Sequence, residues 1–161
     1  MQEIIINWLA GMPKELATFL MSMLPITELR ASIPVAILKY HLSPASAYFW
    51  SILGNTLLGA ITIALVNPLT DLVISKVGWL NRIWEKYIGR LRRKHQKKFA
   101  KWEAWALVSF VAIPLPMTGA FSGAVASSIF KIKAKRAIPL IFLGCLIAGI
   151  IVTFITLAFK S

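Results

Sequence analysis

Two long stretches of this chain carry no charged side chain: residues 45–67 and residues 137–159. Each is long enough to cross the hydrocarbon core of a bilayer as a helix, which takes about 20 residues. The pattern therefore predicts two membrane-spanning helices. Both contain small residues that let helices approach closely in lipid, and these are Gly54, Gly59, Gly144 and Gly149.

Two further apolar regions, residues 15–38 and 102–130, are interrupted. In the second region, the apolar segment 102–113 would form only about 18 Å of helix, too short for a core of about 30 Å. The sequence PLPMTG follows it, and prolines there cannot continue a regular helix. In the first region, PITE interrupts two short apolar segments in the same way. Each region is therefore either one broken span or two half-helices that enter and leave on the same side.

The distribution of positive charge favours the half-helices. The net charge is +12, and ten of the 18 Lys and Arg residues lie in the segment 76–101, with four more in KIKAKR, residues 131–136. Basic loops stay on the cytoplasmic side of a membrane, and a single crossing by residues 102–130 would separate these two segments. We therefore expect re-entrant hairpins, whose irregular backbone is tolerated at membrane depth where it is buried in protein or lines a wet cavity.

The two halves of the chain also share a weak internal repeat. The pattern PIT…LG(x4)G returns as PMT…LG(x4)G, 90 or 91 positions later. The matching pairs are Pro25 and Pro116, Thr27 and Thr118, Gly54 and Gly144, and Gly59 and Gly149. We expect a single all-α membrane domain with two inverted repeats, 13–75 and 102–161, each a re-entrant hairpin plus one membrane-spanning helix. Broken helices that meet near the midplane are a recurring transporter plan.

Composition agrees with a membrane protein and excludes several other classes. Hydrophobic residues make up 58% of the chain, charged residues only 15%, and the mean hydropathy is +0.73. We expect an integral protein of a prokaryotic plasma membrane, with segment 76–101 cytoplasmic and both termini extracytoplasmic. No groove-reading motif accompanies the charge, so we expect no nucleic-acid partner. With one cysteine and no nucleophile–base pair or phosphate loop, we expect no metal, no cofactor and no enzymatic activity.

The basic middle segment has its own pattern. Apolar residues from Trp79 to Leu91 recur at helical spacing, with basic residues between them. This is typical of an amphipathic helix lying on the cytoplasmic leaflet. The residues that we expect to contact anionic lipid headgroups are Arg82, Lys86, Arg90 and Arg93.

Glu28 and Arg30 lie beside the first interruption, in an otherwise apolar setting. A charged side chain at membrane depth costs at least ~2.5 kcal/mol, so such residues usually mark a functional site. The alternative is a structural role, either as an internal ion pair or as partners for the backbone freed at the Pro25 break. The full set of candidate substrate- or ion-binding residues is Pro25, Thr27, Glu28, Arg30, Pro34, Asn55, Pro114, Pro116, Thr118, Gly119 and Ser122.

Three motifs resemble one known family. TELRASIP, the pair GN at residues 54–55 and the later PLPMTGAFSGA are similar to signature segments of the small multidrug export protein family. That family resembles the DedA and VTT-domain membrane proteins. The resemblance implies paired re-entrant loops and lipid-phosphate translocation, with proton coupling as an option and acidic and arginine residues at the loop tips. Only Glu28 and Arg30 match those charges, because the second loop, 114–123, has none.

These observations lead to one main hypothesis and one alternative. The first is a secondary transporter or lipid translocase for an anionic substrate, bound between two re-entrant tips where half-helix N-termini carry partial positive charge. The alternative is a membrane scaffold or lipid-sensing protein in which Glu28 and Arg30 are structural. Two membrane-spanning helices are few to enclose a transport pathway, so we expect a homo-oligomer, most simply a dimer packed through the glycine faces.

Overall fold

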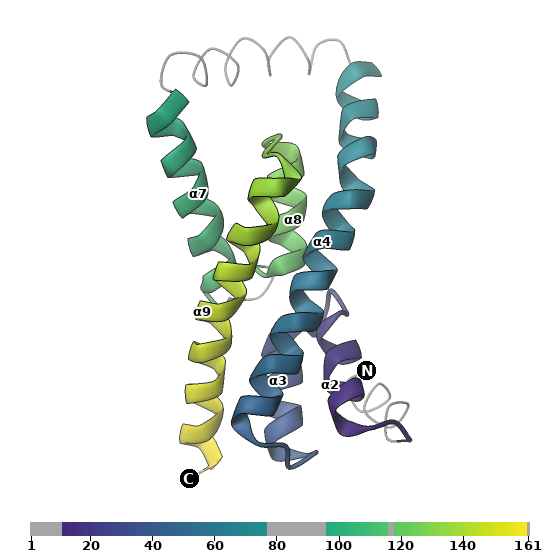
Figure 1. Ribbon diagram of the computed structural model, residues 1–161, viewed down its shortest axis with the longest axis vertical. Helices are drawn as coiled ribbons and strands as arrows, with labels where there is room; N and C mark the ends of the chain where they lie inside the picture. Colours follow the sequence, from purple (N-terminus) through teal and green to yellow (C-terminus); the bar gives the residue numbers. More distant parts are fainter. Residues whose placement is uncertain (1–10, 77–95, 116–117, 161) are drawn as a thin grey trace.

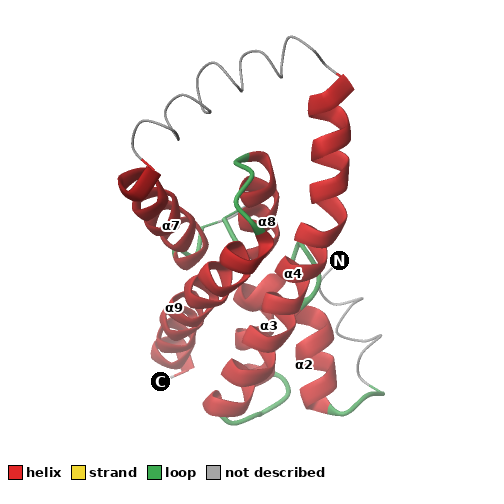
Figure 2. Cartoon of the chain, turned by 45° about the horizontal axis from the view of Figure 1, so that its top comes forward, coloured by secondary structure: helices red, strands yellow, loops and turns green. Residues whose placement is uncertain are grey.

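The computed structural model describes residues 11–76, 96–115 and 118–160. Within these ranges the chain is helical and has no strand (Figure 2). The described helices are α2 (Lys14–Ser22), α3 (Glu28–Leu38), α4 (Pro44–Lys76), α7 (Gln96–Ala112), α8 (Ala120–Ile129) and α9 (Ala134–Lys160). The predicted amphipathic helix, with Arg82, Lys86, Arg90 and Arg93, lies outside the described residues.

The helices α4 and α9 are long and apolar enough to cross a membrane. Their qualifying segments are Pro44–Thr70, with mean hydropathy 1.8, and Ala134–Lys160, with mean hydropathy 2.8. The structure therefore confirms the two span candidates. Both helices begin earlier than the uncharged stretches do. Pro44 fits as the first residue of α4 because that position needs no backbone N–H donor.

The four shorter helices form two helical hairpins. The chain turns between α2 and α3 at residues 23–27. α7 ends at Ala112 and α8 begins at Ala120, so both interruptions lie where the prolines predict them. α7 differs in one respect, because it begins at Gln96 and includes the end of the basic segment. Gln, Lys and Ala are good helix formers, so the helix extends beyond the apolar stretch.

The hairpin turns meet near the middle of the molecule. In Figure 1, α2 and α3 occupy the lower half and α7 and α8 the upper half, while α4 and α9 run past both hairpins. α4 packs against α2, α8 and α9, and α9 packs also against α3 and α7. The start of α2 and the end of α9 lie at the lower end, whereas the end of α4 and the start of α7 lie at the upper end.

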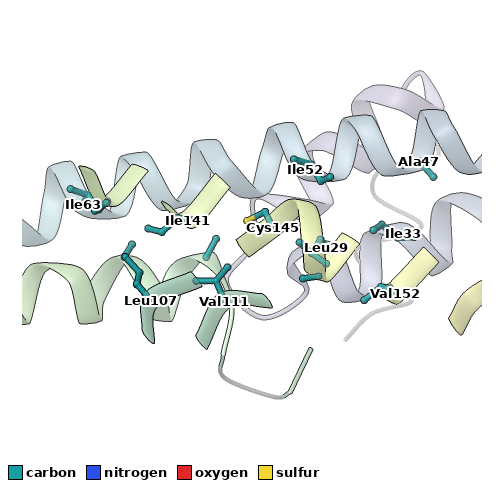
Figure 3. Packing of buried hydrophobic residues seen from close by; sticks show 14 of the residues in the cluster. Leu29, Ile33, Ala47, Ile52, Ile63, Leu107, Val111, Ile141, Cys145 and Val152 are labelled. Atoms are coloured by element: carbon teal, nitrogen blue, oxygen red, sulfur yellow. The ribbon is translucent and has the colours of Figure 1, made fainter. Parts of the chain in front are cut away.

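The core is a continuous apolar cluster with contributions from both hairpins and both long helices (Figure 3). Leu29 and Ile33 from α3 meet Ile52 from α4, Val111 from α7 and Cys145 from α9. Large apolar side chains also cover the outside; the exposed fraction is 63% for Leu65 and 70% for Phe154. An exterior of this kind suits lipid, since soluble monomers rarely expose large contiguous apolar patches.

The four glycines lie at helix crossings inside one chain. A Cβ added at Gly54 would overlap the Phe19 carbonyl and the Ser22 hydroxyl of α2, and one at Gly144 would overlap Val111 of α7. Gly59 faces Ile141 and Ala120, and Gly149 faces Tyr48 and Ile52. Close helix approach is therefore their role, but the expectation that these faces join two copies is wrong. They are buried by the chain's own helices and are not available to a partner.

Candidate functional site

A cavity of about 800 Å³ lies where the two hairpin turns meet. Its walls come from the first turn, from α3, and from the residues that flank the second turn. The lining residues are Pro25, Ile26, Thr27, Glu28, Arg30, Ala31, Pro34, Val35, Pro114, Phe121 and Ser122. The volume falls in the range of small-molecule pockets, about 300–1,000 Å³.

Glu28 connects the first hairpin to the start of α8. Its exposed fraction is only 5%, and its carboxylate oxygen Oε1 accepts a hydrogen bond from the Phe121 backbone N–H at 3.1 Å. α8 has no side-chain cap of its own, since its N-cap residue is Gly119. A carboxylate near a helix N-terminus satisfies a free backbone donor and interacts favourably with the helix dipole. Glu28 therefore caps α8 from another hairpin.

The close approach of Glu28 to α8 requires a glycine. A Cβ added at Gly119 would overlap the Glu28 carboxylate, and both carboxylate oxygens would be in contact with it. Glu28 itself has φ of +46°, which is uncommon for a residue with a side chain. The turn thus holds a strained residue in a position that delivers its carboxylate to α8.

Arg30 connects the same hairpin to the end of α7. Its Nη2 donates to the backbone oxygen of Thr118 and, at 3.0 Å, to the Thr118 hydroxyl. The carbonyl oxygen of Ile113, just past the last residue of α7, is 3.5 Å from the same nitrogen. The Thr118 hydroxyl is in turn 2.7 Å from that carbonyl oxygen. A cation is favourable at this end because helix C-termini carry partial negative charge.

Glu28 and Arg30 thus hold the two ends of the second interruption, one at the start of α8 and the other beside the end of α7. Their hydrogen bonds go to the opposite hairpin and not to each other. The second loop has no charged residue of its own because the first hairpin supplies both charges. The partial positive charge at the N-terminus of α8, which we expected to suit an anionic substrate, is already met by the Glu28 carboxylate. The first turn instead uses Thr27, whose hydroxyl donates to the Met21 carbonyl at 2.6 Å.

The structure gathers most of the candidate residues in this one place. Seven of them line the cavity: Pro25, Thr27, Glu28, Arg30, Pro34, Pro114 and Ser122. Thr118 and Gly119 contact Arg30 and Glu28 as described above, while Pro116 lies outside the described residues. Asn55 does not line the cavity. It is fully buried, with Nδ2 3.8 Å from the Cys145 sulfur, and its Oδ1 has no hydrogen-bond partner among the described residues.

Four apolar lining residues were missed: Ile26, Ala31, Val35 and Phe121. Helical periodicity could have identified two of them. Ala31 and Val35 are four residues apart on α3, as are Arg30 and Pro34, so all four belong to one side of that helix. Ile26 and Phe121 carried no comparable signal, because each lies in or beside a turn whose path is set by contacts between distant segments.

The cavity combines a cation with apolar walls. An arginine has five N–H donors, and Arg30 uses only Nη2 in its hydrogen bonds to described residues. Its remaining donors are suited to a carboxylate or phosphate, while prolines, Ile26, Val35 and Phe121 offer apolar contact. The described residues contain no group of three or more acidic, Cys or His side chains that could hold a metal ion.

Comparison with known proteins identifies a family. No curated protein and no solved structure matches the chain significantly. The family described as "Putative small multi-drug export protein" matches residues 28–151, well over half of the chain, from the start of α3 through all of α4 to most of α9. The chain belongs to this small multi-drug export family of membrane proteins.

Proposed function

We propose that this protein is a secondary transporter or lipid translocase for an anionic amphiphile, bound in the cavity between the two hairpin turns. The observation that carries the proposal is the lining of that cavity. Arg30 lines a space of about 800 Å³ whose other walls are mainly apolar, and its hydrogen bonds to described residues use Nη2 alone. A ligand with one acidic group and an apolar body would satisfy both parts. The family description, which names export, supports the same role.

The proposed topology is an inverted repeat of two re-entrant hairpins, with segment 76–101 in the cytoplasm of a prokaryotic cell and both termini outside. Equivalent contacts support it. Gly54 packs against α2 just as Gly144 packs against α7. At a two-fold axis, a residue contacts its own equivalent. Asn55 contacts Cys145, 90 positions away, and Glu28 contacts Gly119 at nearly the same offset.

Glu28 is the proposed site of proton coupling. As a carboxylate it stabilises the N-terminus of α8; once protonated, it loses the charge that the helix dipole favours. Proton binding would therefore weaken the contact between the hairpins beside the cavity. We also propose a relationship to the DedA proteins, supported by the paired hairpins, and a homodimer that packs through faces other than the four glycines.

One observation favours the alternative, a non-transporting scaffold or lipid-sensing protein. Glu28 and Arg30 already have partners within the chain, at the two ends of the second interruption. Buried polar groups need such partners for stability alone. In that case the two charges would hold the hairpins together and have no further role.

A flux assay in proteoliposomes separates the two functions. Ala31 lines the cavity without taking part in the hydrogen bonds of Glu28 or Arg30, so Ala31→Phe should fill the cavity and leave those bonds intact. The matched control is Leu65→Phe, on the exposed face of α4. We expect Ala31→Phe to abolish efflux of an anionic amphiphile, such as a fluorescent fatty-acid or lysophospholipid analogue, and the control to retain it. Equal flux in both variants would reject the cavity as the pathway.

A further inference from the structure

A second cavity, of about 420 Å³, lies between α7 and α8 near the open end of their hairpin. One wall is a single face of α7, with Trp102, Ala106 and Phe110 at intervals of four residues. The other wall contains Ala126 and Phe130 of α8. The alanines leave space between the helices and the aromatic rings border it, so this groove is almost wholly apolar.

The space between α2 and α3 of the first hairpin holds larger side chains. There, Met21 of α2 is buried, and Leu20, Val35 and Tyr40 pack around it. Large side chains thus fill the space between α2 and α3 that small ones leave open between α7 and α8. The packing between the two helices therefore differs between the first and the second hairpin.

Basic residues lie next to several lining residues of the groove in the sequence. Lys101 precedes the lining residue Trp102, and both are exposed. After α8, the turn to α9 carries Lys131 and Lys133, and Lys135 lies in the first turn of α9. Lys131 lies between Phe130 and Ile132, which both line the groove. Backbone hydrogen bonds of 3.0 Å and 2.8 Å hold that turn against Ser128 and Ser127. Glu103 is the one acidic lining residue, so positive charge predominates.

We propose that this groove binds one phospholipid with an anionic headgroup. An acyl chain would lie against the aromatic and alanine side chains, and the phosphate would contact Lys101 and Lys133 at the mouth. The chain's own basic segment is a poorer occupant, because Arg82, Lys86 and Arg90 would bring like charge to the lysines. A second copy of the chain is also a poorer occupant of this groove wherever it would bring its own basic residues to these lysines. The complementary partner is therefore an anionic amphiphile of the surrounding leaflet.

Native mass spectrometry of the full chain in neutral detergent tests the proposal. The probes are phosphatidylglycerol and phosphatidylcholine with identical acyl chains. We expect tighter binding of phosphatidylglycerol, and an affinity about tenfold weaker for it in the double variant Lys101→Gln/Lys133→Gln, because each lysine near an anionic headgroup adds substantially to binding. Phosphatidylcholine binding should be unchanged. The control Lys14→Gln/Lys39→Gln, with two lysines of the first hairpin, should keep full phosphatidylglycerol affinity.

A steric variant tests the groove itself. Ala106 is exposed, so Ala106→Phe should fold normally while it fills the groove and reduces binding of both lipids. Ala31→Phe, which fills the proposed transport cavity and leaves the hydrogen bonds of Glu28 and Arg30 intact, should not change this binding, which separates the groove from that cavity. Three results would each overturn the proposal. They are equal binding of the two lipids, equal losses of phosphatidylglycerol affinity in the two double lysine variants, and unchanged lipid binding in Ala106→Phe.

Discussion

Replacing Gly119 by Ala tests whether Glu28 caps α8. The backbone at Gly119 is extended, with φ of −119°, so alanine fits its conformation and should by itself stabilise the protein by ~0.4–1 kcal/mol through the unfolded state. The added Cβ, however, would overlap the Glu28 carboxylate. Displacement of the carboxylate would break the hydrogen bond that the Phe121 N–H donates to it. A hydrogen bond to a charged group contributes about 1.5–3 kcal/mol, and the interaction with the helix dipole about 0.3–1 kcal/mol more.

The net expectation is a loss of roughly 1–3 kcal/mol in the free energy of unfolding. It can be measured by titration with a denaturing detergent, followed by circular dichroism. In a Glu28→Ala background there is no carboxylate to displace, so the same Gly119→Ala change should become neutral or stabilising. This reversal of sign is the decisive feature. A stabilising effect in the natural background, or the same loss in both backgrounds, would refute the capping role.

Three further predictions concern other parts of the molecule. Glu28→Gln retains an oxygen acceptor for α8 but cannot ionise, so the protein should fold and lose less than about 2 kcal/mol in the free energy of unfolding. The pH dependence of transport should disappear, and its persistence would remove Glu28 from the proton coupling. Gly54→Leu and Gly144→Leu should each lower the free energy of unfolding by more than about 3 kcal/mol, because the leucine side chain enters a packed helix crossing. Unfolding in denaturing detergent would detect this loss, and unchanged unfolding midpoints would contradict it. With the native cysteine replaced, a cysteine at His41 should react with an impermeant thiol reagent from outside the membrane, and a cysteine at Lys133 from inside. Reaction of both from one side would exclude the inverted repeat.

Local sequence features were sufficient for much of the fold. The length of the uncharged stretches predicted α4 and α9, and proline placement predicted where each hairpin turns. These features act over a few residues, so they can be seen in the sequence. The start of α7 at Gln96 was missed for an equally local reason. Hydropathy was used to find that helix, and the polar helix formers that extend it carry no hydropathy signal.

Contacts between distant segments limited the prediction of the site. Glu28 and Arg30 were identified because charges are costly in an apolar chain, but their partners, Phe121 and Thr118, are 93 and 88 positions away. Such pairing depends on how the hairpins pack, and a single sequence does not record it. The glycines show the same limit. Their small size predicted close helix approach, but whether the neighbour was another helix of the same chain or a second copy required the structure.

We propose that the cavity between the turns is part of a pathway through the membrane, and the accessibility of Ser122 tests this without a known substrate. Ser122 lines the cavity, so a cysteine there, with the native cysteine replaced, should react with a small charged thiol reagent when the protein is in a membrane. Leu65→Cys, on the exposed apolar face of α4, should not. We predict reaction at position 122 from each side of the membrane in separate experiments, since a transport site opens to both. Absence of reaction from either side, or a rate no greater than at position 65, would contradict the account.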